Sequence, residues 1–199
     1  MRNIKAPGKA ALAVALIAAS ALGVAAAQQG PTCFGKAATK VGSAGNNVIR
    51  GTKGPDVIVT KEGDDTVYGF VGKDRICTGK GSDNLYGGDG LDRLGGEKGG
   101  DDLFGGKGND RLIDNLGHDD MFGGAGGDYV SGGEDGDSLS GEAGPDVLRG
   151  GSGADAISGG GGNDRLYGGV GGIDRDSLSG GGGVDLCNEG ENKEGCEKK

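Results

Sequence analysis

One apolar side chain recurs every nine residues along most of this chain. An acidic or amide residue recurs with the same period, two positions earlier, beginning at Asn47. From Asn47 to Asp164 the register holds over fourteen units without a slip. A three-residue insertion near Ile173–Arg175 delays the next acidic residue to Asp176, after which Asp185 follows on schedule. A fixed period of this kind is typical of a repeat architecture rather than of a packed enzyme domain.

Each nine-residue unit predicts a very short strand followed by a turn. Three residues with an apolar centre form the strand, and six Gly-rich residues allow backbone angles that side chains forbid. Because one such strand cannot bury its apolar residue alone, successive units should lie on opposite sides of a flat coil, with residue i stacked on i+18 about 4.8 Å away. The expected fold is all-β: a right-handed parallel β-roll, which is a β-solenoid with two repeats per coil and two sheets of short strands.

The i+18 rule sorts the apolar residues into two facing ladders, which form the whole expected core. One ladder is Ile58, Ile76, Leu94, Leu112, Val130, Leu148 and Leu166, and the other is Ile49, Val67, Leu85, Leu103, Met121, Leu139 and Ile157. Composition agrees with so thin a core, since 50 of the 199 residues are Gly and only four Tyr and four Phe are present, without Trp. An ordinary two-layer domain around a large core is therefore excluded.

The same rule stacks the turn carboxylates, which are the candidate metal ligands. Asp56, Asp74, Asp92, Asp110, Asp128, Asp146 and Asp164 fall on one edge, Asp65, Asp83, Asp101, Asp119, Asp137 and Asp155 on the other, and Asp176 and Asp185 follow the insertion. Two unit charges ~5 Å apart repel by roughly 0.8 kcal/mol in water and roughly 3 kcal/mol at an effective dielectric near 20. Asp and Gly are also good turn formers, which is the alternative explanation.

A cation between neighbouring turns would turn this repulsion into attraction. Carboxylate and main-chain oxygens in flexible turns favour Ca²⁺ over Mg²⁺, which prefers a tight octahedron, and over Zn²⁺, which prefers His or Cys. We therefore expect multiple calcium ions and a chain that folds as it binds them.

The unit Gly-Gly-x-Gly-x-Asp-x-(apolar)-x resembles the calcium-binding nonapeptide of the RTX, or haemolysin-type, family over residues 42–189. The likeness is clear in turns such as Gly105–Asp110. The resemblance implies that each ion lies between turns n and n+2, held by Asp side chains and main-chain oxygens. The pattern is looser at Thr60-Lys61, Glu97, Asp114-Asn115, Asp135 and Glu142, which replace glycines. Those turns are the weaker candidate sites.

The first 27 residues have the layout of a secretory signal. Three basic residues precede an apolar stretch from Ala10 to Val24, and three alanines precede Gln28. A membrane anchor is the alternative, but about 15 apolar residues, mostly Ala, fall short of the ~20 needed to span a bilayer. The predicted division is a signal peptide at 1–27, an N-terminal cap segment at 28–41, calcium-binding repeats at 42–189 and a tail at 190–199. We expect a secreted, extracellular protein without membrane insertion.

Removal of the three leader cations would change the net charge from −9 to −12. This charge disfavours nucleic acid as a partner and favours cations. An extracytoplasmic location makes the four cysteines candidates for two disulfides. Cys187 with Cys196 would close a short polar loop, which favours Cys33 with Cys77 among the three pairings. Free thiols or a metal site are the alternatives, and the spacings match no zinc pattern.

Two outward-facing columns follow from the i+18 rule. Tyr68, Tyr86, Phe104 and Phe122 line one sheet, and Arg75, Arg93 and Arg111 line the other. Stacked aromatics commonly stabilise a sheet face. A surface for an extracellular glycan, a protein or a second copy is the alternative for the aromatic column, whereas the Arg column is interpreted as a solvated face.

We expect no catalytic activity. Only short segments flank the repeats, and His118, beside Asp119, is interpreted as an exposed variable turn residue rather than a general base. RTX toxins usually lack an N-terminal leader, so the leader here disfavours a toxin. The predicted function is a secreted calcium-binding repeat protein. The alternative is an extracellular adhesin or matrix protein that calcium rigidifies and whose aromatic column contacts a partner.

Overall fold

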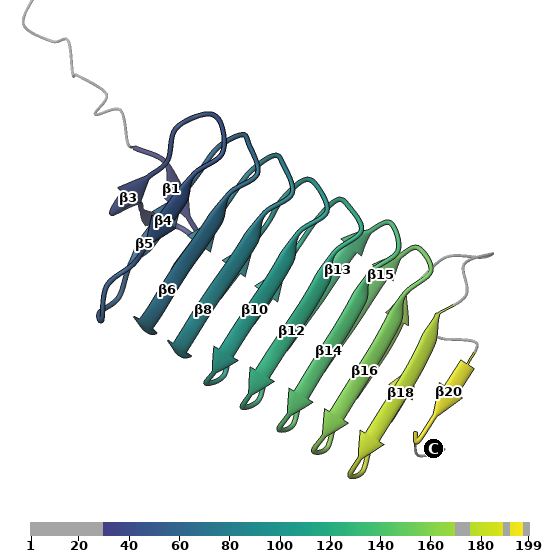
Figure 1. Cartoon of the computed structure of the whole chain (residues 1–199). Helices are drawn as coiled ribbons and strands as arrows, with labels where there is room; N and C mark the ends of the chain where they lie inside the picture. Colours follow the sequence, from purple (N-terminus) through teal and green to yellow (C-terminus); the bar gives the residue numbers. More distant parts are fainter. Residues whose placement is uncertain (1–29, 170–175, 189–191, 197–199) are drawn as a thin grey trace, which may run out of the picture.

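The structure is a computed structural model that describes residues 30–169, 176–188 and 192–196. Within these ranges the chain forms twenty β-strands and no helix (Figure 1). The strands are β1 (Thr32–Cys33), β2 (Lys36–Ala37), β3 (Lys40–Val41), β4 (Val48–Arg50), β5 (Val57–Val59), β6 (Thr66–Gly72), β7 (Arg75–Cys77), β8 (Asn84–Gly90), β9 (Arg93–Gly95), β10 (Asp102–Lys107), β11 (Arg111–Ile113), β12 (Asp120–Ala125), β13 (Tyr129–Glu134), β14 (Ser138–Ala143), β15 (Val147–Ser152), β16 (Ala156–Gly161), β17 (Arg165–Gly169), β18 (Ser177–Gly182), β19 (Leu186–Asn188) and β20 (Asn192–Glu194).

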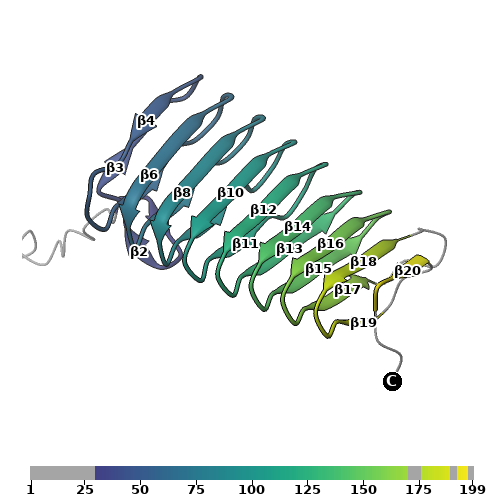
Figure 2. The ribbon, with the colours of Figure 1, turned by 60° about the horizontal axis from the view of Figure 1, so that its bottom comes forward.

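Two parallel nine-stranded sheets make up the body of the molecule. The even-numbered strands from β4 to β20 form one sheet, and the odd-numbered strands from β3 to β19 form the other. Figure 2 shows the two sheets as separate layers, joined by turns at both edges. Because the chain changes sheet after every strand, two repeats complete one coil. The all-β parallel β-roll predicted from the nine-residue period is confirmed.

The strand register follows the predicted offset of eighteen residues. Leu85 pairs with Leu103, and Leu103 pairs with Met121. After the insertion, which lies outside the described residues, Ile157 pairs with Leu178, an offset of 21. The insertion therefore lengthens one connection without moving the following strand out of register.

From β6 to β18 the strands of the even-numbered sheet are longer than the three residues predicted, and so are β13, β15 and β17 of the other sheet. β8, for example, has seven residues and continues through the glycines that follow its apolar centre. These glycines pair across coils as the apolar residues do, as in Gly88 with Gly106. The reason is that a glycine offers main-chain hydrogen-bonding groups to the ladder while leaving room for the chain to bend. The expectation of a six-residue turn after every strand is thus wrong for these longer strands of both sheets.

The core is the thin double ladder that the sequence predicts. Fourteen apolar side chains between Ile58 and Leu178 are at most 3% exposed and form one cluster, against which Ile49 and Cys187 pack at the two ends. At about 25 cal/mol per Å², each buried aliphatic side chain contributes about 1.5–3 kcal/mol. Every coil adds only two such side chains. A coil therefore stabilises the fold only if the free-energy cost of its turns is smaller than this gain.

Each end of the roll carries a disulfide. Cys33–Cys77, with Cα atoms 5.7 Å apart, ties the β1–β2 hairpin to β7 and forms a small second cluster with Val59. Cys187–Cys196, with Cα atoms 5.8 Å apart, joins β19 to the segment after β20. The favoured cysteine pairing is confirmed. The predicted signal peptide lies outside the described residues, and within them no helical segment has the length and hydropathy that crossing a bilayer requires.

The outward-facing columns also form as predicted. Ring centroids from Tyr68 to Tyr86, Phe104 and Phe122 lie 5.0, 4.9 and 5.1 Å apart, with nearly parallel planes. On the other sheet, the Arg column ends where the Arg111 guanidinium lies 4.4 Å from the ring centroid of Tyr129. Offset stacking and cation–π contacts of this kind each contribute about 0.5–1.5 kcal/mol.

Candidate metal sites

The turn aspartates stack along the two edges of the roll. The backbone N–H of Asp92 donates to Oδ1 of Asp110 at 2.7 Å, and that of Asp110 donates to Oδ1 of Asp128 at 2.7 Å. We call edge I the edge formed by the turns that end in Asp56, Asp74, Asp92, Asp110, Asp128, Asp146, Asp164 and Asp185. We call edge II the one formed by the turns that end in Asp65, Asp83, Asp101, Asp119, Asp137, Asp155 and Asp176. The predicted stacking is confirmed on both edges.

These carboxylates are buried, and eleven of them keep an oxygen that has no hydrogen-bond donor. Their exposed fractions range from 0 to 7%. One oxygen of a typical member accepts the N–H described above, while the other is buried and accepts no hydrogen bond. Such Oδ2 atoms belong to Asp65, Asp74, Asp92, Asp101, Asp110, Asp119, Asp128, Asp137, Asp146, Asp164 and Asp185. Burying an ionised carboxylate with one side unpaired is costly, so the turns have a strong preference for a compensating charge.

A glycine at the first position of each edge I turn creates the space beside this oxygen. A Cβ on Gly87 would lie 2.8 Å from Oδ2 of Asp92 and 2.6 Å from the carbonyl oxygen of Gly105, one coil further on. A Cβ on Gly159 would lie 2.5 Å from both Oδ2 of Asp164 and the carbonyl oxygen of Gly180. The absence of a side chain thus lets a carboxylate and a main-chain oxygen converge from adjacent coils.

The donor set fits calcium. It consists of hard oxygens only, it combines side-chain and main-chain donors, and it is built from flexible glycine-containing turns. In each turn the Asp would supply the charged ligand, and the first-position carbonyl of the next turn on that edge would supply a neutral one. On edge I, from Asp74 to Asp185, the aspartates that the sequence proposed as ligands have their unsatisfied oxygens beside this space.

Burial and stacking together raise the pKa of the carboxyl groups. For Asp110, burial is the main cause, the neighbouring Asp92 and Asp128 add to it, and the N–H donated to the carboxylate opposes it, so that the pKa rises to about 7. For Asp146 the same causes, with Asp128 and Asp164 as the neighbours, raise the pKa to about 7. Near neutral pH these turns therefore bind a proton or a cation in preference to standing ionised and alone.

Asp56, in the first turn of edge I, differs from the other stacked aspartates because a lysine side chain contacts its carboxylate. The Lys40 ammonium lies 2.8 Å from Oδ1 of Asp56, and the backbone and hydroxyl of Thr52 donate to Oδ2 at 2.6 and 2.9 Å. Although burial acts to raise the pKa of Asp56, Lys40 and Thr52 lower it below the ordinary value. The repeat period could not find this contact, since Lys40 precedes the repeats. Asp56 remains a predicted ligand, but both of its oxygens already have partners.

Several turns have a larger residue at a position with a positive φ angle, which glycine adopts more easily. Phe70, Glu97, Asp135 and Glu142 have φ angles of 79°, 83°, 73° and 71°. Positive φ costs a residue with a Cβ roughly 1 kcal/mol or more, which the surrounding ladder must offset. Three of the turns that the sequence marked as weaker, those with Glu97, Asp135 and Glu142, therefore retain the backbone path of their neighbours.

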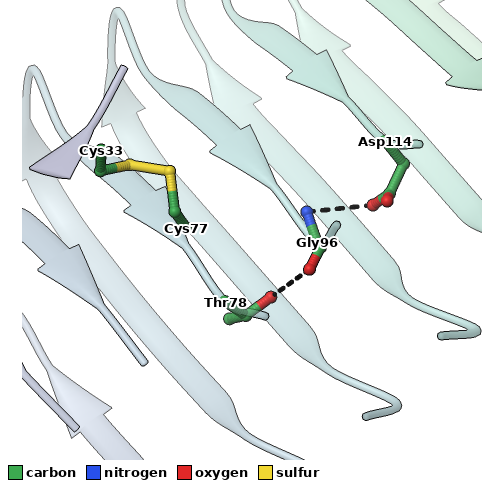
Figure 3. Close-up of a disulfide and its surroundings, with 5 residues drawn as sticks. All are labelled: Cys33, Cys77, Thr78, Gly96 and Asp114. Atoms are coloured by element: carbon green, nitrogen blue, oxygen red, sulfur yellow. Dashed lines mark hydrogen bonds between the residues drawn. A yellow bond between two sulfur atoms is a disulfide. The ribbon is translucent and has the colours of Figure 1, made fainter. Parts of the chain in front are cut away.

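Asp114 is the site residue that sequence reasoning missed. It replaces the first glycine of an edge II turn, and it is 3% exposed. Its Oδ2 accepts the N–H of Gly96 at 3.0 Å, and its Oδ1 accepts that of Asn115 at 2.8 Å. Burial, followed by the charges of Asp119 and Asp101, raises the pKa of Asp114 to about 8. Figure 3 shows its carboxylate directed at Gly96, whose carbonyl accepts the hydroxyl of Thr78 on the other side.

His118 has the exposed position that the sequence predicts. Its Nδ1 lies 2.8 Å from the carbonyl oxygen of Gly136, one coil further along edge II. This contact, the largest influence, raises the pKa of the imidazole above its ordinary value. His118 therefore contributes to stacking between turns.

The repeats match a known family. Four copies of the sequence model of the RTX calcium-binding nonapeptide repeat match residues 41–76, 68–103, 95–130 and 131–166, which together cover more than half of the chain. No curated protein sequence matches the chain. The family match covers turns of both edges, and it includes most of the aspartates whose unsatisfied oxygens are described above.

Proposed function

Because the chain belongs to the RTX calcium-binding nonapeptide repeat family, we propose that it is a secreted protein whose roll forms when calcium ions bind along both edges. The observation that carries this proposal is the pair of columns of buried carboxylates, in which the eleven aspartates named above keep an oxygen that has no protein donor. The core of two apolar residues per coil is too thin to offset this cost alone. Calcium supplies the missing positive charge when bound, and folding and binding are therefore coupled.

Fourteen of the fifteen turn aspartates that the sequence identified are the ligands we favour. Asp56 is set apart, since Lys40 and Thr52 already occupy its oxygens. The interior coils, such as those of Asp92, Asp110 and Asp128, have a carboxylate on both sides along their edge and should bind most uniformly. The first-position glycines of these turns, Gly87, Gly105 and Gly123, each lie against the carbonyl oxygen of the next first-position glycine along the edge.

Secretion is supported by two observations of different kinds. The sequence begins with a basic, then apolar, then Ala-rich segment, as secretory leaders do. The described residues also contain two disulfides, which form and persist in oxidising compartments. Extracellular calcium-binding modules typically have dissociation constants of about 10⁻⁴–10⁻³ M, so export would also deliver the chain to a compartment in which such modules bind calcium. We propose no catalytic role, because cation binding accounts for the acidic turns.

A calcium titration of the secreted chain tests the proposal. In EDTA the far-UV circular dichroism should be that of a largely disordered chain, and millimolar Ca²⁺ should produce a β spectrum. Mg²⁺ at the same concentration is the control, because it requires a tight octahedral shell and should produce much less structure. An identical spectrum in Ca²⁺ and in EDTA would contradict the proposal.

A second candidate function is adhesion through the aromatic column. Four half-buried rings stack without a break along one sheet, and a surface hollow lies at the end of the column, lined by Phe104, Phe122 and Glu142. Aromatic faces beside a carboxylate suit a sugar ring, so the occupant would be an extracellular glycan. A Tyr86→Ser, Phe104→Ser double variant should keep its calcium-dependent fold and lose glycan binding. Tyr129→Ser, on the opposite sheet, is the matched control.

A further inference from the structure

One turn of edge II places an acidic side chain where a glycine usually leaves a space. The first positions along this edge are Thr60, Thr78, Gly96, Asp114, Gly132, Gly150 and Gly168. Within residues 30–169, 176–188 and 192–196, Asp101, Asp114 and Asp119 form the one group of three acidic side chains whose oxygens lie within 4.8 Å of one another. Asp101 and Asp119 end two consecutive turns of the edge, and Asp114 begins the second of them.

The oxygens of this group converge on a buried space. Asp101 is 0% exposed and Asp119 is 2% exposed, and the Oδ2 atom of each accepts no hydrogen bond. A Cβ on Gly96 would overlap Oδ2 of Asp101 and Oδ2 of Asp114 at once. Both oxygens therefore point into the space that Gly96 leaves open. The two unsatisfied oxygens are an observation independent of the count of acidic residues, and they show that the group lacks a positive partner.

The hydrogen bonds of Asp114 do not complete the group. Its two oxygens each accept one backbone N–H, from Gly96 and Asn115. A carboxylate oxygen can accept a second contact, so Asp114 can bind its N–H donors and a cation together. Neither backbone donor carries a charge, and among the residues that the structure describes no cationic side chain bonds these oxygens. One cation bound among the three carboxylates would therefore supply the positive charge that all of them lack.

We propose that Asp101, Asp114 and Asp119 form a single calcium site of higher charge than the repeating sites, and that this site binds its ion most tightly and fills first. The inference rests on the proposed function, because it ranks one site within a calcium-binding array. An ordinary turn supplies carboxylates only from its sixth position, whereas this turn adds one from its first. Calcium affinity rises with the number of charged ligands, and all donors here are oxygens.

The position of the group gives this ranking a structural consequence. Asp101 directly precedes β10, Asp114 directly follows β11, and Asp119 directly precedes β12. These strands lie near the middle of both sheets. An ion bound here first would join two adjacent coils at the centre of the roll, from which further coils can add in both directions.

Calcium titration calorimetry of the full secreted chain tests the site, with two variants and one control. Asp114→Gly restores the common repeat residue, and Asp114→Asn keeps the shape while removing the charge. Asp120→Asn is the control, because it removes the same charge from an exposed neighbouring side chain. The unaltered chain should show one binding step that is tighter than the rest by on the order of tenfold or more. Both Asp114 variants should lose that step, and the control should retain it.

The outcomes separate this inference from the proposed function. If the unaltered chain binds no calcium, the proposed function fails. If it binds calcium and folds, but the tight step is missing or persists in both Asp114 variants, this inference alone is overturned. Circular dichroism in excess calcium must show that at least one Asp114 variant folds. Failure of both variants to fold would also overturn the inference, because it would assign Asp114 a structural role rather than that of a ligand to one ion.

Discussion

The two edges of the roll differ in the residues that stand at the first position of their turns. At the first position of every described edge I turn stands a glycine, and the space beside it holds a carboxylate and a main-chain oxygen. On edge II three of the first positions carry side chains with oxygens, namely Thr60, Thr78 and Asp114. The hydroxyl of Thr78 donates to the carbonyl of Gly96 at 3.0 Å, and Asp114 accepts the N–H of the same glycine. A side-chain oxygen can therefore occupy the space that glycine usually leaves open.

This difference shows which part of the repeat is constant in this chain. The aspartate at the sixth position persists on both edges, while the first position of edge II is either glycine or a residue with a side-chain oxygen. Edge I should therefore behave as a row of nearly equivalent sites. Edge II should behave as a graded row, in which the turn beginning at Asp114 differs most from the others.

The largest difference in stability between the two edges should appear when one methyl group is added to an edge I glycine. The Cβ in Gly105→Ala would overlap the carbonyl oxygen of Gly123 and Oδ2 of Asp110, which are backbone and buried carboxylate rather than a movable side-chain end. We expect a loss of about 2–4 kcal/mol in the free energy of unfolding in calcium and weaker calcium binding at that turn.

Thr78→Ala is the matched edge II variant, since it produces the same residue at the same position of the repeat. It removes one buried hydrogen bond to Gly96 and should cost about 1–2 kcal/mol. Denaturant unfolding of both variants in calcium checks the ranking. Equal losses would show that the first positions of the two edges are equivalent after all.

A smaller effect, on calcium affinity, should distinguish the interior coil of Asp110 from the end coil of Asp56. Asp110→Asn removes a carboxylate whose Oδ2 has no protein partner, so calcium affinity should fall by on the order of tenfold. Asp56→Asn removes a carboxylate that already bonds Lys40 and Thr52, so it should cost about 1 kcal/mol of stability and leave calcium affinity nearly unchanged. Calcium titrations of the two variants decide the matter, and a larger affinity loss for Asp56→Asn would contradict the assignment of Lys40 as its partner.

The nine-residue period was enough to predict the topology, the offset of eighteen, the core ladders and the stacked aspartates. These features depend only on which residues become neighbours when the chain coils. The contacts of Lys40 and Asp114 were not predictable in the same way. Lys40 belongs to a segment outside the period, and the role of Asp114 depends on the space that Gly96 leaves one coil away. Strand length was underestimated because a glycine pattern indicates bending but does not show which main-chain groups still pair.

The smallest effect we expect is the response of the calcium-free chain to acid, and it should be shared by both edges. In the folded state the pKa rises to about 7 for Asp110 and Asp146 on edge I and for Asp101 and Asp137 on edge II, with burial as the main cause. A folded pKa above the unfolded value of 3.8 means that the roll binds more protons than the disordered chain. The stability that these groups contribute is therefore fully present below pH 3.8 and is lost as the pH rises through about 7. In EDTA, circular dichroism should thus show more β structure at pH 5 than at pH 8, whereas calcium binding should weaken on acidification because the ion and the protons compete. A calcium-free chain that becomes less ordered at pH 5 would show that the buried carboxylates are not what opposes folding.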